Sequence, residues 1–242
     1  MRRAIEKLGP AYVKVAQALS TRVDILSPSY LAEIERLQDR VPTFSDTIAW
    51  NAIAEGLGPV EATFAKLSPS PVAAASLGQV YKGVLLPALG GHAVAVKVRR
   101  PGVQAQVALD LHIMRQVAVA ARRLPSVRSD WAGVIDAWAV SFLEEMDYEL
   151  ESDNARRFKA DVAAEQLSGI VVPEVYQATA GVLVSEWIDG EKLSESRSGD
   201  VRELCNTLLN SYLVQLLDTG FLHAVSSAVR PTLPWPRLGA GT

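Results

Sequence analysis

The first part of the chain has apolar residues at helical spacing. The positions that define this pattern lie three or four residues apart: Ile5, Leu8, Tyr12, Val15 and Leu19. The spacing predicts one kinked or two short helices over residues 5–21, interrupted at Gly9-Pro10. A second helix is predicted over residues 29–38, and Ser45 is the expected N-cap of a third that continues through Ala54. Residues 1–58 are therefore expected to be helical.

The pattern changes after residue 62 to one that is typical of strands. Two β-like runs, 77–85 and 93–98, are separated by Pro87, Gly90 and Gly91, which predicts an antiparallel hairpin. Two shorter runs follow at 170–176 and 181–187. We expect all four runs to belong to one small sheet.

Three further stretches have helical periodicity. The first follows Pro101-Gly102 and continues to Arg123, and the second is predicted as one long helix from residue 131 to about 159, rich in acidic residues near its middle. The third covers residues 201–218. From Val225 onward, Ser, Ala, Gly and Pro replace the periodic pattern, which predicts a tail without regular structure.

Composition and charge exclude several classes of function. The 242 residues carry 24 basic and 27 acidic side chains, so a broad basic surface for nucleic acid is not expected. No apolar run approaches the roughly 20 residues that a transmembrane helix needs. The three histidines are scattered, which argues against a zinc site, and the single cysteine, Cys205, cannot form an internal disulfide.

Lys97 is the one charged residue in the apolar run of residues 93–98. Burying an ammonium group without a partner costs roughly several kcal/mol, because the group loses its hydration. Lys97 therefore either faces solvent or meets a carboxylate or a phosphate. Kinase-like folds place their phosphate-binding lysine on a strand of this kind, paired with a glutamate from a following helix.

An acidic cluster offers several partners for such a lysine. Its members lie within eight residues: Glu144, Glu145, Asp147, Glu149 and Glu151. On a continuous helix three of them would share one face, and their mutual repulsion there calls for a cation. Lys97, Lys14 or a divalent metal could supply it, and the spacing does not choose among them.

A stretch of small residues precedes the first strand of the hairpin and consists of Ala73, Ala74, Ala75 and Ser76. Small side chains let backbone amides approach an anion, as in phosphate-binding loops. A tight turn or a helix cap packed against the sheet explains the same composition equally well. The sequence contains no Walker A motif and no Gly-x-Gly-x-x-Gly motif.

In this order the motifs resemble those of the UbiB family, the aarF-domain atypical kinases, over nearly all of residues 8–224. Residues 8–22 resemble the family's Lys-x-Gly-Gln helix, with Lys14 and Gln17 in its outer places, and residues 73–79 its alanine-rich loop. Residues 94–103 resemble the lysine strand followed by Arg-Pro-Gly-Val. Residues 145–147 resemble the Glu-x-Asp motif, and residues 186–190 the segment that links the two lobes.

The resemblance implies an α+β fold, namely a protein-kinase-like N-lobe with an N-terminal helical extension and an incomplete C-lobe. The expected boundaries are 1–58 for the extension, 59–190 for the N-lobe with its inserted helices, 191–224 for the start of the C-lobe and 225–242 for an unstructured tail outside the family pattern. The resemblance further implies that the N-lobe precedes the C-lobe, as in kinases, and that the extension folds over the nucleotide cleft.

The resemblance also implies the roles of individual residues. Lys97 paired with Glu151 would orient the phosphates of ATP or ADP, while residues 73–76 cover them and Glu186 lies at the segment that links the lobes. Lys14, Gln17, Glu145 and Asp147 would line the cleft. These assignments are carried over from the family's motifs.

Two departures from the family pattern change the expectation. Ala16 stands where the family has glycine, which adds a methyl group near the cleft. After Ala224 the family continues with Asp-Pro-His-Pro-Gly-Asn and later Asp-Phe-Gly, whereas this sequence continues with Val225-Ser226-Ser227. The catalytic aspartate and the ligands for the magnesium ion that the family uses are therefore expected to be missing, so that no catalytic residue and no metal site is retained.

The expected activity is nucleotide binding without phosphoryl transfer, in a family associated with quinone and prenyl-lipid metabolism. The alternatives are a non-catalytic module that binds a protein partner or a paralogue, and a truncated gene product without function. The resemblance to plastid and cyanobacterial members implies a plastid location at lipid bodies, with peripheral membrane association. A mitochondrion or a bacterial cytoplasm is the alternative location.

Overall fold

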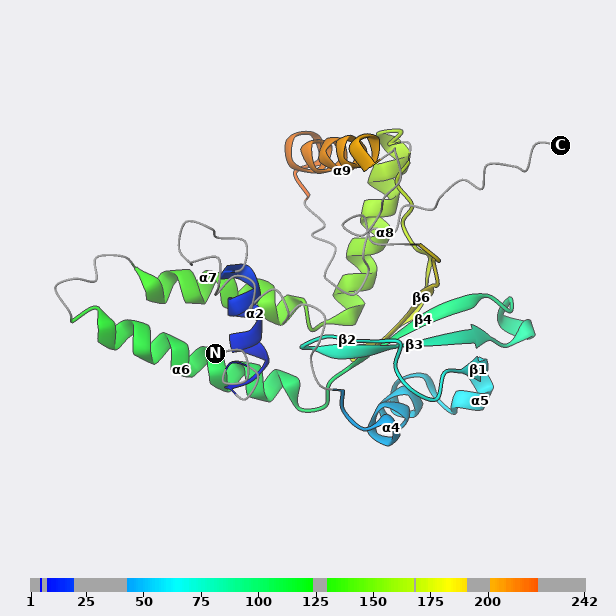
Figure 1. The fold of residues 1–242 in the computed structure, drawn as a ribbon, viewed down its shortest axis with the longest axis horizontal. Coiled ribbons are helices and arrows are strands. Elements are labelled where there is room, and N and C mark those ends of the chain that lie inside the picture. The colour runs from blue at the N-terminus through cyan, green and yellow to red at the C-terminus, as the bar shows by residue number, and fades with distance from the viewer. Residues whose placement is uncertain are drawn as a thin grey trace.

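The computed structural model describes residues 5, 8–19, 43–123, 130–167, 169–190 and 201–221. The helix predicted over residues 29–38 and the tail from Val225 lie outside the described residues. The described chain combines one antiparallel sheet with helices that pack on both of its faces and at one end (Figure 1). An α+β fold of the kinase-like kind was predicted, and this mixed architecture confirms it.

The sheet has six strands in the order β1-β3-β4-β6-β5, with β2 paired to β3 outside this path. Their bounds are β1 Phe64–Leu67, β2 Ala73–Ala74, β3 Gly78–Leu85, β4 Ala93–Arg99, β5 Val175–Ala178 and β6 Val182–Glu186. The predicted hairpin is β3 and β4, joined by a short 3-10 turn. Gly90 and Gly91 follow this turn with φ of 98° and 64°, a conformation that glycine adopts without steric cost.

The alternation of side chains along β4 gives the sheet two different faces. Val94, Val96 and Val98 are fully buried and pack against Ile53 of helix α4, Asp46–Leu57. The residues between them, including Lys97, therefore lie on the opposite face, because successive side chains of a strand alternate. A short helix, α5 Val60–Thr63, leads from α4 into β1.

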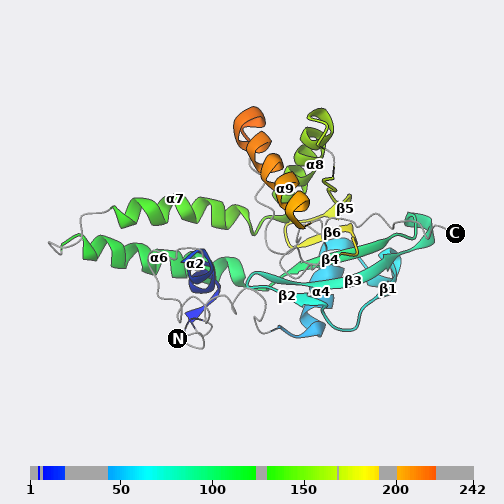
Figure 2. The ribbon, with the colours of Figure 1, turned by 45° about the horizontal axis from the view of Figure 1, so that its top comes forward.

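A pair of long helices extends from one end of the sheet. These are α6 Val103–Ala121 and α7 Trp131–Glu144, and helix α2, Pro10–Leu19, packs across α6 (Figure 2). Their shared core joins apolar side chains from all three helices, from residue 77 just before β3 and from residue 146 just after α7: Ala11, Leu77, Val103, Val107, Leu111, Phe142 and Met146. This core fixes α2 beside the end of the sheet at which β3 begins.

The prediction of one long helix from residue 131 to about 159 is wrong, because the helix ends with α7 and a new helix begins as α8, Tyr148–Ala164. The Asp147 carboxylate accepts hydrogen bonds from the amides of Glu149 and Leu150 at 3.0 and 3.3 Å, which makes it the N-cap of a new helix. The Arg99 guanidinium donates to the Met146 carbonyl at 2.7 Å and holds the break in place.

The described chain ends with helix α9, Val201–Val214, which continues as a π-helical turn, Gln215–Thr219. Among the described helices, none combines the length and the apolar character that crossing a bilayer requires.

Candidate functional site

Lys97 lies in the middle of β4, between Val80 of β3 and Leu183 of β6. Its ammonium Nζ is 2.9 and 2.7 Å from the two carboxylate oxygens of Glu151, 54 residues further along the chain. The two side chains are only 12% and 15% exposed. Of the partners that the sequence left open, the structure places Glu151 against Lys97, in a charge pair that is mostly shielded from water.

Helix α8 brings Glu151 to this position. The helix begins at Tyr148, directly after its N-cap Asp147, so that Glu151 lies one turn into the helix and on the same side as Tyr148. The Tyr148 ring is fully buried, and the Lys97 ammonium lies 4.5 Å from its centroid. Burial, reinforced by the negative charge of Glu151, raises the pKa of Tyr148, so this side chain stays a neutral phenol.

Lys14 of α2 reaches the same junction from the N-terminal side. Its ammonium lies 2.5 Å from the Glu145 carboxylate, and the two side chains are 24% and 20% exposed. This contact joins residues 131 positions apart and ties α2 to the turn between α7 and α8. The acidic cluster is thus divided: Glu151 meets Lys97, Glu145 meets Lys14, and Asp147 caps α8.

The neighbours of Lys14 on α2 are also placed. Ala16 is 5% exposed, so the methyl group that replaces the family's glycine is accommodated inside the packing of α2. Gln17 is half-buried on the same helix. Lys14, Ala16 and Gln17 therefore belong to one short helix beside the α7–α8 junction.

The alanine-rich segment is largely an extension of the sheet. Ala73 and Ala74 pair with Val80 and Gln79 as strand β2, and the Ala75 amide donates to the Gly78 carbonyl at 2.8 Å to close a tight turn. Ser76, within this turn, is buried. The backbone of residues 75–78 thus forms a tight turn. Because this turn leads into β3, whose Val80 pairs with Lys97, it lies near the lysine.

Gly78 is the point at which this turn approaches the lysine pair. A Cβ atom at this position would lie 2.4 Å from the Val98 carbonyl oxygen and 2.9 Å from the Tyr148 hydroxyl. Only glycine therefore fits between β4 and α8. The turn, the lysine strand and α8 meet at this residue.

Glu186 lies apart from the lysine pair. It ends β6 opposite Val94, and its carboxylate accepts a hydrogen bond from the Glu174 amide at 3.2 Å. The chain then leaves the sheet through Trp187, over whose ring the Lys82 ammonium lies at 4.3 Å. The carboxylate of Glu186 is exposed, so any contribution of this segment to the site comes from its position at the exit of the sheet.

Sequence reasoning missed two residues that build the site, Arg99 and Tyr148. The Arg99 guanidinium donates to the carbonyls of Met146 and Ala180 at 2.7 and 2.6 Å, which joins the α7–α8 break to the turn between β5 and β6. Strand alternation was the available signal, because Arg99 follows Lys97 by two residues and lies on the same face. For Tyr148, only the position of the helix break reveals that it faces the sheet.

A metal centre is not found at this site. Within the part of the chain that the structure describes, no three His, Cys, Asp or Glu side chains lie close enough together to hold a metal ion. The carboxylates nearest to Lys97 and Lys14 are already engaged by these lysines.

Comparisons of the sequence with a family model and with curated proteins point to the same family. The model of the ABC1 atypical kinase-like domain matches residues 36–225. An uncharacterized chloroplastic aarF domain-containing protein kinase of Arabidopsis thaliana is 43% identical over 93% of this chain and 32% of its own length. An uncharacterized protein of the cyanobacterium Synechocystis is 42% identical over 93% and 34%. The chloroplastic protein ACTIVITY OF BC1 COMPLEX KINASE 3 of Arabidopsis is 40% identical over 93% and 32%.

A solved structure agrees with these relatives. The Mycobacterium tuberculosis protein Rv3197, determined as a complex with erythromycin, is 28% identical and superposes with a TM-score of 0.60 over 86% of this chain and 53% of its own. The chain spans about a third of the length of the curated relatives named above, at 32–34%.

Proposed function

Because the chain belongs to the ABC1 atypical kinase-like family, we propose that it binds an adenine nucleotide, ATP or ADP, and does not complete phosphoryl transfer with the residues present here. The observation that carries this proposal is the contact of the Lys97 ammonium with both carboxylate oxygens of Glu151, on the face of the sheet turned toward α8.

The geometry of the pair suits phosphate binding. Glu151 holds the ammonium in one place, so that a phosphate would meet a cation that is already ordered and pays little conformational entropy on binding. Low exposure strengthens the attraction between the ammonium and an incoming anion, because the surroundings screen charge less than water does. The tight turn at residues 75–78 would lie over the phosphates.

The absence of turnover is proposed from the residues that phosphoryl transfer requires. Transfer depends on magnesium ions that neutralise the developing charge and on an aspartate that accepts the proton of the attacking hydroxyl. The family match ends at residue 225. From there the sequence reads Val225-Ser226-Ser227, in place of the Asp-Pro-His-Pro-Gly-Asn that the resemblance leads us to expect.

The setting of this activity is proposed from the relatives. Their names include chloroplastic proteins of Arabidopsis, and Synechocystis is a cyanobacterium, which supports a plastid or bacterial origin. We place the chain at plastid lipid bodies, as a peripheral protein that acts in quinone or prenyl-lipid metabolism. Fractionation of plastids with an antibody against the chain tests this location, and recovery only in the soluble fraction would contradict it.

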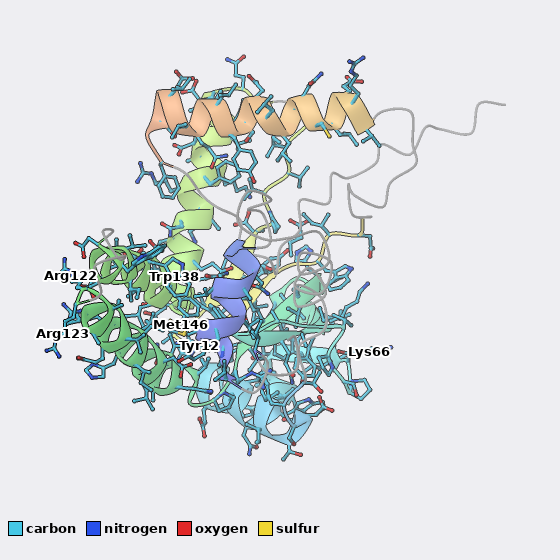
Figure 3. The ribbon with its side chains drawn as sticks, turned by 60° about the vertical axis from the view of Figure 1, so that its left-hand side comes forward. Tyr12, Lys66, Arg122, Arg123, Trp138 and Met146 are labelled. Atoms are coloured by element: carbon cyan, nitrogen blue, oxygen red, sulfur yellow. The ribbon has the colours of Figure 1, made fainter. Side chains whose placement is uncertain are left out.

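Thermal unfolding with and without nucleotide tests the proposed function. We expect ATP and ADP to raise the melting temperature of the wild-type protein, and Lys97→Ala to abolish the shift. Lys66→Ala is the matched control, because Lys66 is an exposed lysine of β1 that lies away from Met146 and the α7–α8 junction (Figure 3). A shift that survives in Lys97→Ala, or no shift in the wild type, would contradict the proposal. Incubation with ATP and magnesium should release no phosphate above the Lys97→Ala background.

A second candidate function is a non-catalytic module that binds a protein partner, and one observation favours it. Helix α9 and the turn after it leave large apolar side chains exposed: Leu209, Leu213, Leu216 and Leu217. Exposed apolar patches mark interaction surfaces. Sedimentation velocity of the wild type and of Leu216→Glu tests this function, which predicts association in the wild type that the charge removes. A monomer at all concentrations would leave the nucleotide site as the functional feature.

A further inference from the structure

Tyr148 is placed at the centre of the site without belonging to any group that the sequence motifs single out. It is the first residue of α8, it is fully buried, and it packs with Val175 of β5 and Leu183 of β6. The face of its ring lies under the Lys97 ammonium, at 4.5 Å from the centroid. Its hydroxyl points at Gly78, where a Cβ atom would be 2.9 Å away.

The contact between the ring and Lys97 is electrostatic as well as apolar. The face of an aromatic ring carries a partial negative charge, and a cation over it is attracted more strongly when both groups are withdrawn from water. Here the lysine side chain is 12% exposed and the tyrosine is fully buried. The ammonium is therefore held by two contacts from α8, the Glu151 carboxylate and the Tyr148 ring.

The hydroxyl contributes differently. It is buried and has no hydrogen-bond partner among the described residues, a state that costs free energy. Phenylalanine would fill the same space without that cost. What the side chain gives the site is thus its ring, together with the close contact that requires glycine at position 78.

We propose that Tyr148 is a positioning residue of the nucleotide site, whose ring fixes the Lys97 ammonium so that it meets the phosphates of a bound nucleotide. This inference rests on the proposed nucleotide-binding function. Because Tyr148 also contacts Gly78, the lysine, its glutamate and the turn at residues 75–78 keep one arrangement before any nucleotide arrives. Tyr148 itself does not touch the nucleotide.

Graded fluorination of the ring tests the proposal without changing its shape. Tyr148→Phe serves as the reference, and 4-fluoro- and 3,4,5-trifluorophenylalanine at position 148 then remove the negative charge of the ring face in steps. The measured quantity is the ratio of the dissociation constants of adenosine and ADP, which isolates binding to the phosphates. We expect this ratio to fall by about three- to ten-fold along the series, in keeping with the strength of a desolvated cation–π contact, while adenosine affinity stays constant. Tyr176→Phe is the control outside the site, since this ring stacks on His92.

A constant ratio along the series, or an equal loss of adenosine and ADP affinity, would overturn the inference and give the ring a structural role only. A second measurement needs no nucleotide: fluorination should lower the free energy of unfolding in the wild-type background and have no effect in Lys97→Met. If ADP fails to bind even the wild type, the proposed function fails, and this second measurement still decides whether the ring holds the lysine.

Discussion

Removing one member of the Lys97–Glu151 pair should destabilise the fold more than removing both. At about 2.8 Å and an effective dielectric constant of about 20, the attraction between the two charges is roughly 6 kcal/mol, most of which the loss of hydration offsets. Breaking a buried pair by removing one partner costs about 3–5 kcal/mol. Because these side chains are 12% and 15% exposed, and water therefore reaches the remaining charge, we expect about 2–3 kcal/mol for Lys97→Met or Glu151→Leu.

The double variant Lys97→Met/Glu151→Leu leaves no unpaired charge, so it should cost less than either single substitution. The resulting coupling energy is at least about 2–3 kcal/mol, measurable by urea denaturation followed by tryptophan fluorescence. The exposed pair Arg115–Asp136, with side chains 46% and 50% exposed, supplies the control cycle, and its coupling energy should be much smaller because water screens the two charges. Coupling for the buried pair as small as that of the control would refute the reasoning that links burial to the strength of this contact.

Three further substitutions test the packing around the site. Gly78→Ala places a Cβ atom 2.4 Å from a carbonyl oxygen of β4 and should destabilise the fold by at least about 1–3 kcal/mol. Gly181→Ala is the control, because its nearest contact is at 3.8 Å, and its effect should stay within about 0.5 kcal/mol. Equal melting temperatures of the two variants would contradict the close packing at Gly78. Asp147→Ala removes the α8 cap and should lower the free energy of unfolding, measured by urea denaturation, by about 1 kcal/mol, most of which Asp147→Ser restores. An unchanged free energy of unfolding in Asp147→Ala would show that the cap does not hold the break. Burial raises the pKa of Asp110, so the folded state holds this proton more tightly and loses stability as the pH rises from the carboxyl's ordinary pKa toward its raised value. Asp110→Asn should therefore be more stable than the wild type at pH 7 and equal to it at about pH 3. Parallel pH profiles for the wild type and Asp110→Asn would contradict this assignment.

The sequence predicted the elements that have a long run of alternating or periodic apolar residues. The β3–β4 hairpin was predicted exactly at two of its four strand ends and to within one residue at the other two, because two alternating runs flank a loop with glycines and a proline. Strands β1 and β2 were not predicted, since they have four and two residues and only pairing with β3 makes them strands.

The break between α7 and α8 shows why periodicity alone misleads. Phe142, Met146 and Leu150 continue the helical spacing across the break, so the apolar pattern gives no sign of it. The break depends on Asp147 as a cap and on a hydrogen bond from Arg99, a residue of β4. The second contact is tertiary and has no trace in the local sequence.

The same limit applies to the site. Lys97 stands out in the sequence as a single charge in an apolar strand, and the residue types around it indicate an anion or a carboxylate as its partner. The choice of Glu151 among five acids depends on where α8 begins, and the contact of Lys14 with Glu145 joins residues 131 positions apart. Tyr148 becomes part of the site only when the helix that it begins is placed against the sheet.

The most direct test of the nucleotide site uses the double variant Lys97→Met/Glu151→Leu, whose fold should be close to that of the wild type. Isothermal titration of both proteins with ADP measures whether the charge pair is what binds the phosphates. We predict a saturable binding isotherm for the wild type and at least about a hundred-fold weaker binding for the double variant, in keeping with the loss of a charged contact worth about 3 kcal/mol. Equal ADP affinity of the two proteins would contradict the proposal that Lys97 and Glu151 form a nucleotide site.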